Sequence, residues 1–268
     1  MKLSFSTLSC PRWSWNEIVS TAADLGYDGI EVRGVGKDIS VPSVPEFSDD
    51  KLADTINRLN KLNLQIPCLT SDCCINVRGD EEYLHNEINA YITLAKKMNV
   101  PYIRVMAAEP VPEVKGEVDV PYIIEQAKLL GNMAQQQGRT ILLETHGVWS
   151  DSEKFAKLMQ SINHDNVNVL WDIHHPFRFM KETAAHTYNN LKQWIKHVHA
   201  KDGIVAENGK YKYVLPGLGD IPILESYNIL KDNNYDGYFS LEWVKRWDLS
   251  LEEPGVVLAS FINYMKSL

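Results

Sequence analysis

Four short apolar runs of this chain each end in a side chain that can bind a metal ion. The runs cover residues 141–144, 169–172, 197–199 and 239–242, and they end in Glu144, Asp172, His199 and Glu242. Each run has the character of a buried strand, so each ligand stands where a strand finishes. In a parallel α/β barrel the carboxyl ends of all strands meet on one face, and that face carries the chemistry. The pattern therefore predicts one site that contains all four side chains.

These side chains would offer a divalent cation three carboxylates and one imidazole. Buried carboxylates are costly unless they are paired or bound to metal, and three of them together would repel one another without a cation. Any one acid alone is equally well explained as a helix cap or an ion-pair partner, but four ligands at strand ends favour a metal site. The set suits Mn²⁺, Mg²⁺, Co²⁺ or Zn²⁺. Because three carboxylates favour a hard six-coordinate ion, we expect one divalent ion, with Mn²⁺ first.

Further reactive side chains lie close to these ligands in the sequence. His197 and His199 point to the same side of their strand because side chains alternate, and only His199 is near enough to the strand end to reach the ion. His197 is expected to fill the core. Lys201 would hold a substrate oxygen, unless it forms a surface ion pair with Asp202. His175, just beyond the second run, would orient the substrate or move a proton.

Two arginines and several tryptophans are expected near the same strand ends. Arg33 and Arg104 would reach a carboxylate, phosphate or hydroxyl group of a substrate, although Arg33 has a structural pair with Glu31 as its alternative. Aromatic rings there would stack on the C–H faces of a sugar, while core packing explains them equally well. The tryptophans are Trp13, Trp15, Trp149, Trp243 and Trp247.

Strand and helix signals alternate along the whole chain. Ser14 with Glu17 three positions later predicts a helix capping box, and Gly26 predicts the end of that helix. Strands are expected over residues 3–9, 28–33, 65–70, 102–106, 140–145, 168–173, 195–200 and 238–243. Such β–α units imply right-handed crossovers, a parallel sheet and one (β/α)8 barrel domain over residues 1–268. An open doubly wound sheet is disfavoured because no glycine occurs in the turn after the first strand. Pro-rich stretches at 34–47 and 108–119 are expected to be long loops that shape the pocket.

Composition excludes several functional classes. The 268 residues carry a net charge of −8 without a basic cluster, which argues against a general nucleic-acid binder. No apolar stretch reaches the roughly 18 residues of a membrane span, and the N-terminus lacks the apolar core of a signal peptide. The 4 cysteines form no Cys-x-x-Cys pair, so we expect free thiols and a cytoplasmic protein. A homo-oligomer is compatible with the sequence.

Several segments resemble the sugar phosphate isomerase/epimerase family with the xylose-isomerase-like TIM barrel. The segments are LGYDGIEVR at 25–33, LLETH at 142–146, WDIHHP at 171–176, HVHAKD at 197–202, PGLGD at 216–220 and YDGYFSLEW at 235–243. The resemblance implies one divalent metal on Glu144, Asp172, His199 and Glu242, with His175 and Lys201 as substrate contacts.

The resemblance also implies an enzyme of carbohydrate metabolism that acts on a sugar or keto-polyol. We expect an isomerase or epimerase that works through an enediolate, with Glu144 and Glu242 moving the proton. A dehydratase at the same site and a non-catalytic sugar-binding barrel are the alternatives. In ketose 3-epimerases an Arg lies six residues beyond the ligand His, where this chain has Val205. The His-x-Lys-Asp form resembles the inosose isomerase and dehydratase branch.

Endonuclease IV, a DNA-repair nuclease, is a related barrel that the chain resembles at its ligand positions. Its three-metal site needs further histidines after strands three and four, and an Asp-x-His after strand seven. The corresponding residues here are 70–73, 106–109 and 202–204, which contain no histidine. Neither these histidines nor a basic face is present, so we expect no nucleic-acid partner.

Overall fold

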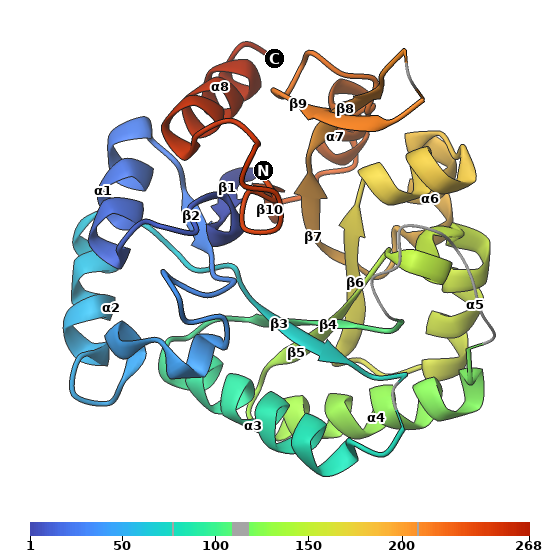
Figure 1. The fold of residues 1–268 in the computed structure, drawn as a ribbon. Coiled ribbons are helices and arrows are strands. Elements are labelled where there is room, and N and C mark those ends of the chain that lie inside the picture. The colour runs from blue at the N-terminus through green and yellow to red at the C-terminus, as the bar shows by residue number, and fades with distance from the viewer. Residues whose placement is uncertain (77, 109–117, 208) are drawn as a thin grey trace. The chain divides into compact units, whose positions relative to one another are not determined.

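The computed structural model describes residues 1–76, 78–108, 118–207 and 209–268. One eight-stranded sheet runs in the order β2-β1-β10-β7-β6-β5-β4-β3 (Figure 1). Its strands are β1 (Lys2–Ser6), β2 (Gly29–Glu31), β3 (Cys68–Cys74), β4 (Tyr102–Met106), β5 (Thr140–Glu144), β6 (Val167–Asp172), β7 (Ile195–Ala200) and β10 (Tyr238–Leu241). Parallel pairing joins β1 to β2 and β10, β10 to β7, and β3 through β6 in sequence. This order is the one that the alternating strand and helix signals predict for a (β/α)8 barrel.

β2, which stands at one end of the sheet order, also has a parallel neighbour on its outer side. A parallel bridge joins Gly29 of β2 to Gln65, which lies just ahead of β3 in the chain. The N–H of Ile30 donates to the carbonyl of Gln65 (2.9 Å), and the N–H of Gln65 donates to the carbonyl of Asp28 (3.1 Å). These bonds bring the segment that leads into β3 alongside β2, the opposite end of the strand order.

Helices connect consecutive strands of the sheet, and a last helix follows β10. They are α1 (Trp15–Leu25), α2 (Leu52–Lys61), α3 (Glu81–Lys97), α4 (Val120–Gln136), α5 (Ser152–Ile162), α6 (Ala184–Leu191), α7 (Ile223–Asp232) and α8 (Pro254–Lys266). None of the helices in the described ranges is long and apolar enough to cross a membrane.

The chain divides into two compact units. The first contains Met1–Ile66 with Val198–Leu268, and the second contains Pro67–His197. The first unit therefore includes β1, β2, β10 and the end of β7, and the second includes β3 to β6. The expectation of one domain over residues 1–268 stays a prediction.

Local sequence explains where the elements begin and end. Ser14 accepts a hydrogen bond from the N–H of Glu17, and Glu17 accepts one from the N–H of Ser14, so the predicted capping box is confirmed. Gly26 ends α1 with a positive φ of 75°, a conformation that favours glycine. The apolar face of α1 is buried and recurs every three or four residues; it consists of Trp15, Ile18, Val19 and Ala22.

Some expectations differ from the structure. The first strand ends at Ser6, and residues Thr7–Ser9 form a 3-10 turn in which the Ser9 hydroxyl donates to the Ser6 carbonyl. An antiparallel hairpin of β8 (Asp202–Val205) and β9 (Tyr211–Val214) was not expected, because four-residue strands give little periodic signal. The 34–47 stretch contains the short 3-10 helices Val41–Ser43 and Pro45–Phe47. Most of the predicted 108–119 loop lies outside the described residues. None of the four cysteines, all of which lie in the described ranges, is part of a disulfide, in agreement with the prediction.

Candidate metal and proton-transfer site

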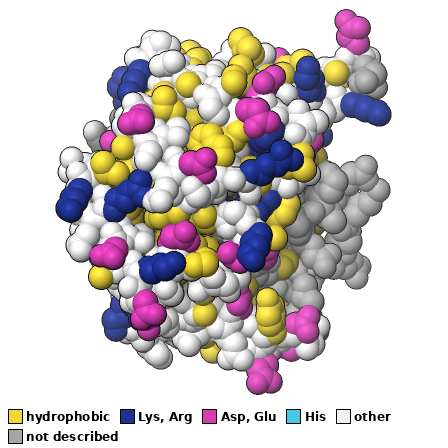
Figure 2. Space-filling view, turned by 60° about the vertical axis from the view of Figure 1, so that its left-hand side comes forward, with side chains coloured by type: hydrophobic (Ala, Val, Ile, Leu, Met, Phe, Trp, Pro, Cys, Tyr) yellow, Lys and Arg dark blue, Asp and Glu magenta, His cyan; other side chains and the backbone are white. Residues whose placement is uncertain are grey.

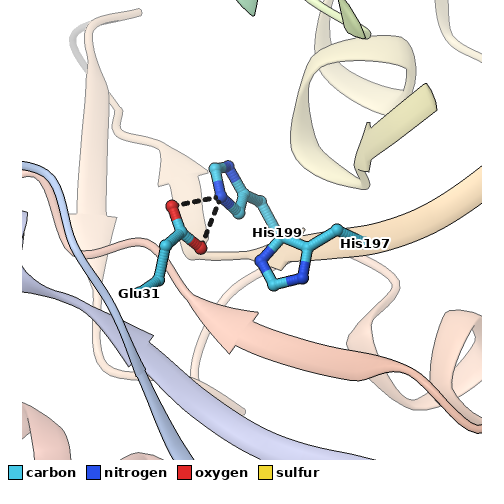
Figure 3. Close-up of side chains that lie close together, drawn as sticks. All are labelled: Glu31, His197 and His199. Carbon is cyan, nitrogen blue, oxygen red and sulfur yellow. Dashed lines mark hydrogen bonds and ion pairs between the residues drawn. The ribbon is translucent and has the colours of Figure 1, made fainter. Parts of the chain in front are cut away.

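The first group of site residues surrounds His199, near the end of β7. Its Nε2 atom lies 2.9 Å and 3.0 Å from the two carboxylate oxygens of Glu31, and both side chains are completely buried (Figure 3). Nδ1 of the same ring lies 3.5 Å from Oε1 of Glu242. A proton on Nε2 that points to Glu31 leaves Nδ1 as the lone-pair nitrogen. The strand end thus presents an oriented imidazole beside a buried carboxylate.

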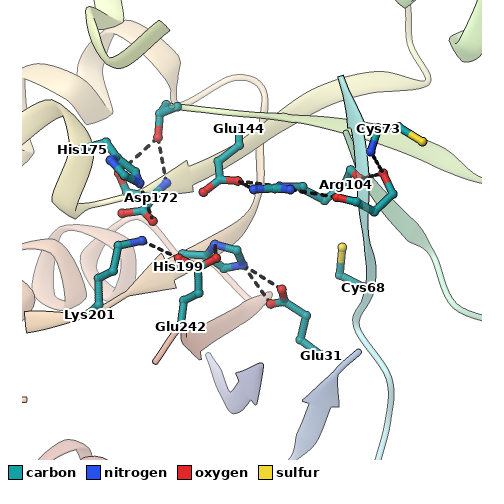
Figure 4. Close-up of polar contacts among 12 residues, drawn as sticks. Glu31, Cys68, Cys73, Arg104, Glu144, Asp172, His175, His199, Lys201 and Glu242 are labelled. Carbon is teal, nitrogen blue, oxygen red and sulfur yellow. Dashed lines mark hydrogen bonds and ion pairs between the residues drawn. The ribbon is translucent and has the colours of Figure 1, made fainter. Parts of the chain in front are cut away.

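Lys201 lies next to the same carboxylate. Its ammonium group is bonded to Oε2 of Glu242, and the exposed fractions of the two residues are 1% and 6% (Figure 4). The surface ion pair with Asp202, the alternative for Lys201, is not the pairing seen. Buried charges of this kind are stable only when paired, and here each provides the charge that the other needs.

Asp202 has a separate structural role, which the sequence did not reveal. Its carboxylate accepts hydrogen bonds from the N–H groups of Gly203, Gly217, Gly219 and Ile221. Burial raises the pKa of Asp202, although these four N–H donors oppose that effect. The carboxylate fixes the Gly-rich segment against the start of β8, directly beside Lys201.

The second group of site residues surrounds Glu144, at the end of β5. Arg104 of β4 donates both Nε and Nη2 to a single oxygen, Oε2, and Glu144 is 1% exposed. Arg104 is held in turn by Ser71 of β3, whose carbonyl accepts from Nη1 at 2.9 Å and whose hydroxyl donates to the Arg104 carbonyl. The guanidinium therefore approaches the carboxylate in a fixed orientation (Figure 4).

Asp172 ends β6 and is completely buried. Its oxygen Oδ1 accepts from the N–H of His174 at 2.9 Å, and its Oδ2 lies 3.5 Å from Nε2 of His175. The Thr145 hydroxyl accepts from the N–H of Asp172 at 2.8 Å and donates to its carbonyl. The rings of His146 and His175 are 4.2 Å apart between centroids. Asp172, His174 and His175 each offer an atom that could ligate a metal.

Arg33 is placed by the loop that follows β2 and is only 3% exposed. Its N–H donates to the Thr7 hydroxyl, its Nη1 donates to the Ile39 carbonyl, and its guanidinium lies over the ring of Trp247. Glu31, the partner considered for Arg33, contacts His199 through both carboxylate oxygens. Three of the tryptophans expected near the site are buried, whereas Trp247 is 56% exposed; the buried ones are Trp15, Trp149 and Trp243.

The donor chemistry fits a divalent cation. Each expected ligand is at or next to a strand end, and all are nearly or fully buried; they are Glu144, Asp172, His199 and Glu242. Buried carboxylates and a neutral imidazole form the oxygen and nitrogen set that such ions take. Glu31 is the residue that sequence reasoning missed. Its signal was present, since an acid ends the apolar run of β2 just as acids end β5 and β6.

The chain matches known proteins along nearly its whole length. Residues 19–266 match the model of a family described as "Xylose isomerase-like TIM barrel". Fructoselysine 3-epimerase of Shigella flexneri is 24% identical and the alignment covers 100% of this chain and 98% of that protein. Inosose dehydratase of Clostridium beijerinckii is 26% identical, with coverage of 85% and 82%. A solved structure of the IolI protein with a bound zinc atom has a TM-score of 0.77 at 20% identity, with coverage of 99% and 97%.

Proposed function

This chain belongs to the xylose isomerase-like TIM barrel family, and from that premise we propose that it is a divalent-metal-dependent isomerase or epimerase of a sugar or keto-polyol. One observation carries the proposal. Two buried glutamates at strand ends, Glu144 and Glu242, are each held through Oε2 by a buried cation, Arg104 and Lys201 respectively. Paired carboxylates fixed in this way are suited to removing a proton from carbon and returning it.

We assign the ion to Glu144, Asp172, His199 and Glu242. The zinc atom named for the IolI structure supports a divalent ion in this fold, while the three carboxylates still favour Mn²⁺. Such an ion supplies Lewis-acid chemistry, which acidifies the C–H bond between a carbonyl and a hydroxyl group. Glu31 holds the His199 ring in the orientation that directs Nδ1 toward Glu242.

The side chains of the site have separate roles in proton transfer, positioning and substrate contact. Glu144 takes the proton from one face of the reacting carbon, and Glu242 delivers it to the other, or the reverse. Arg104 and Lys201 keep each carboxylate in place, and either cation is also close enough to its glutamate to contact a substrate oxygen bound there. His175, beside Asp172, and Arg33, in the loop after β2, would contact the substrate hydroxyl groups.

A dehydratase that uses the same site is the second candidate. The similarity to inosose dehydratase favours it, as the similarity to fructoselysine 3-epimerase favours the epimerase. In the dehydratase, the carbanion formed after proton removal expels a β-hydroxyl group instead of being reprotonated. Val205 occupies the position at which ketose 3-epimerases have Arg. Its side chain, 63% exposed at the end of β8, is uncharged, so it offers no cation to a free ketohexose.

A non-catalytic sugar-binding barrel and a nuclease are less well supported. A binding protein has no need of two buried glutamate–cation pairs. In Figure 2, acidic and basic side chains are interspersed over the coloured part of the visible face, and no continuous basic stripe is seen there. Nucleic-acid binding generally needs such a stripe to neutralise phosphates.

Solvent deuterium exchange tests the proposal. The protein is incubated in D₂O with a panel of ketoses, aldoses, inososes and 3-keto-glycosides, and each sugar is then examined by NMR and mass spectrometry. The proposal expects deuterium at a carbon next to the carbonyl, without loss of water. Loss of water would instead identify the dehydratase. Glu144→Gln and Glu242→Gln should each reduce exchange by about 10²-fold or more, with little change in KM. Normal turnover by Glu144→Gln would refute its assigned role.

A further inference from the structure

Arg246 lies in the loop that follows β10, four residues beyond Glu242. Its backbone N–H donates to the carbonyl of Leu8 at 3.0 Å, and its Nη1 donates to the carbonyl of Gly36 at 2.9 Å. Leu8 follows β1 and Gly36 follows β2. Arg246 therefore joins the loops at the carboxyl ends of three strands of the first unit, the same ends at which Glu31 and Glu242 stand.

One edge of the Arg246 guanidinium has no acceptor. Both Nε and Nη2 are buried, and neither has a hydrogen-bond partner among the described residues. These two atoms carry parallel N–H bonds, the geometry that binds both oxygens of a carboxylate or two oxygens of a phosphate. Buried donors without acceptors cost free energy, so an edge of this kind needs an explanation.

No described acid neutralises Arg246. The one group whose charge would act on it is the thiol of Cys10, which is completely buried. Burial raises the pKa of Cys10 far above its usual range, so the thiol stays neutral and provides no counter-charge. Burial also lowers the pKa of Arg246, a further sign that its charged form lacks a partner.

The neighbouring cations differ from Arg246 in this respect. Lys245 donates to the carbonyls of Leu249 and Leu251, and it pairs with Glu253 at 2.9 Å. Arg33 donates to a carbonyl and packs against the Trp247 ring. These contacts hold the side chains of Lys245 and Arg33 in place. No such contact with a described residue involves the Nε and Nη2 atoms of Arg246.

We propose that Arg246 binds an anionic group of the substrate, a carboxylate or a phosphate, through Nε and Nη2. This rests on the proposed function, because the anion is taken to be part of the molecule whose reacting carbons lie at Glu144 and Glu242. Loops after the last strands of (β/α)8 barrels frequently bind phosphate groups. Arg246 as a whole is only half-buried and its neighbour Trp247 is exposed, so the guanidinium lies close to the surface. The substrate class is then an acidic sugar derivative or a sugar phosphate.

Anion titration by calorimetry on the full chain tests the assignment. Inorganic phosphate and malonate are the probes, at constant ionic strength set with chloride. Wild type should bind at least one probe saturably, and Arg246→Gln should weaken that binding by about tenfold or more, because both charge-assisted bonds are lost. Arg246→Lys keeps the positive charge but loses the parallel Nε and Nη2 donors, so it should also weaken anion binding. This variant tests the Arg246 assignment if Arg246→Gln fails to fold. Arg12→Gln is the matched control, since Arg12 is an exposed arginine in the loop after β1.

The outcomes separate this assignment from the metal proposal. Phosphate binding alone indicates a phosphorylated substrate, and malonate binding alone indicates an acidic one. His199→Asn should leave anion affinity within about twofold of wild type, because it alters the assigned metal ligands and not Arg246. If His199→Asn abolishes anion binding while Arg246→Gln does not, the anion binds the metal and the Arg246 assignment is wrong. It is equally wrong if wild type binds neither probe, or if Arg12→Gln weakens binding as much as Arg246→Gln.

Discussion

Replacing Glu31 by glutamine removes one negative charge from beside His199 and changes almost nothing in size. In the native protein both oxygens of Glu31 lie within 3.0 Å of Nε2, and neither residue is exposed to solvent. In the proposed site this carboxylate would fix the Nε2–H tautomer of His199 and make Nδ1 a stronger donor to the metal ion. Loss of such an outer carboxylate typically weakens metal binding by about 10- to 100-fold. At about 1.4 kcal/mol per tenfold change, this is roughly 1.4–2.7 kcal/mol of binding free energy.

Competition with a chromogenic chelator measures this effect directly. Wild type and Glu31→Gln are titrated with Mn²⁺ and, separately, with Zn²⁺, and the two dissociation constants are compared. Glu17→Gln is the matched control, since it removes the same charge from an exposed position of α1. Its metal affinity should equal that of wild type. An affinity of Glu31→Gln within about twofold of wild type would refute the reasoning, because His199 would then not be a ligand oriented by Glu31.

Three further predictions concern stability. Arg104→Met removes the cation that pairs with the buried carboxylate of Glu144, so urea denaturation of metal-free protein should show a loss of about 3–5 kcal/mol in the free energy of unfolding. Adding Glu144→Gln should recover most of this loss. No recovery would mean that the broken ion pair is not its cause. Asp151 caps α5, and its partial burial is outweighed by the hydrogen bonds and ammonium group that lower its pKa. Asp151→Ala should therefore cost about 1 kcal/mol at pH 7, a difference that shrinks as the pH falls through the folded-state pKa of the carboxyl group; a pH-independent difference between the two denaturation curves would contradict this. A Cβ at Gly219 would overlap the carboxylate of Asp202, to which the Gly219 N–H donates. Gly219→Ala should therefore lower the free energy of unfolding by about 1–3 kcal/mol in thermal melts. Gly255→Ala in α8 is the control and should not, because the space around Gly255 is open.

The fold could be predicted because its signals are periodic and local. β4 and β7 have the predicted bounds, and the other strands of the sheet differ from prediction by at most four residues at either end. The β8–β9 hairpin is different. Its pairing is set by contacts between short strands, and Asp202 fixes the turn that follows through backbone N–H groups that no side-chain pattern records.

The candidate site could be predicted as a set of residue types at strand ends, but its pairings could not. The sequence placed Glu31 beside Arg33 and Lys201 beside Asp202, since these residues are close in the chain. The structure pairs Glu31 with His199 and Lys201 with Glu242. Lys201 and Glu242 follow β7 and β10, which are neighbouring parallel strands far apart in the sequence, whereas Glu31 and His199 are on β2 and β7, which are not neighbours in the sheet. Such partners come together only through the tertiary arrangement of the strands. The roles of these residues in metal binding and catalysis stay predictions.

Metal content per chain tests the central claim most directly. Elemental analysis is made on protein purified without added metal, and again after reloading with Mn²⁺ and removal of the excess. We predict one tightly held divalent ion per chain in wild type, and a large loss of it in His199→Asn. Glu17→Gln should retain the ion, which controls for the purification. No retained ion under either condition, or equal retention in His199→Asn, would contradict the assigned ligand set and the proton-transfer chemistry that depends on it.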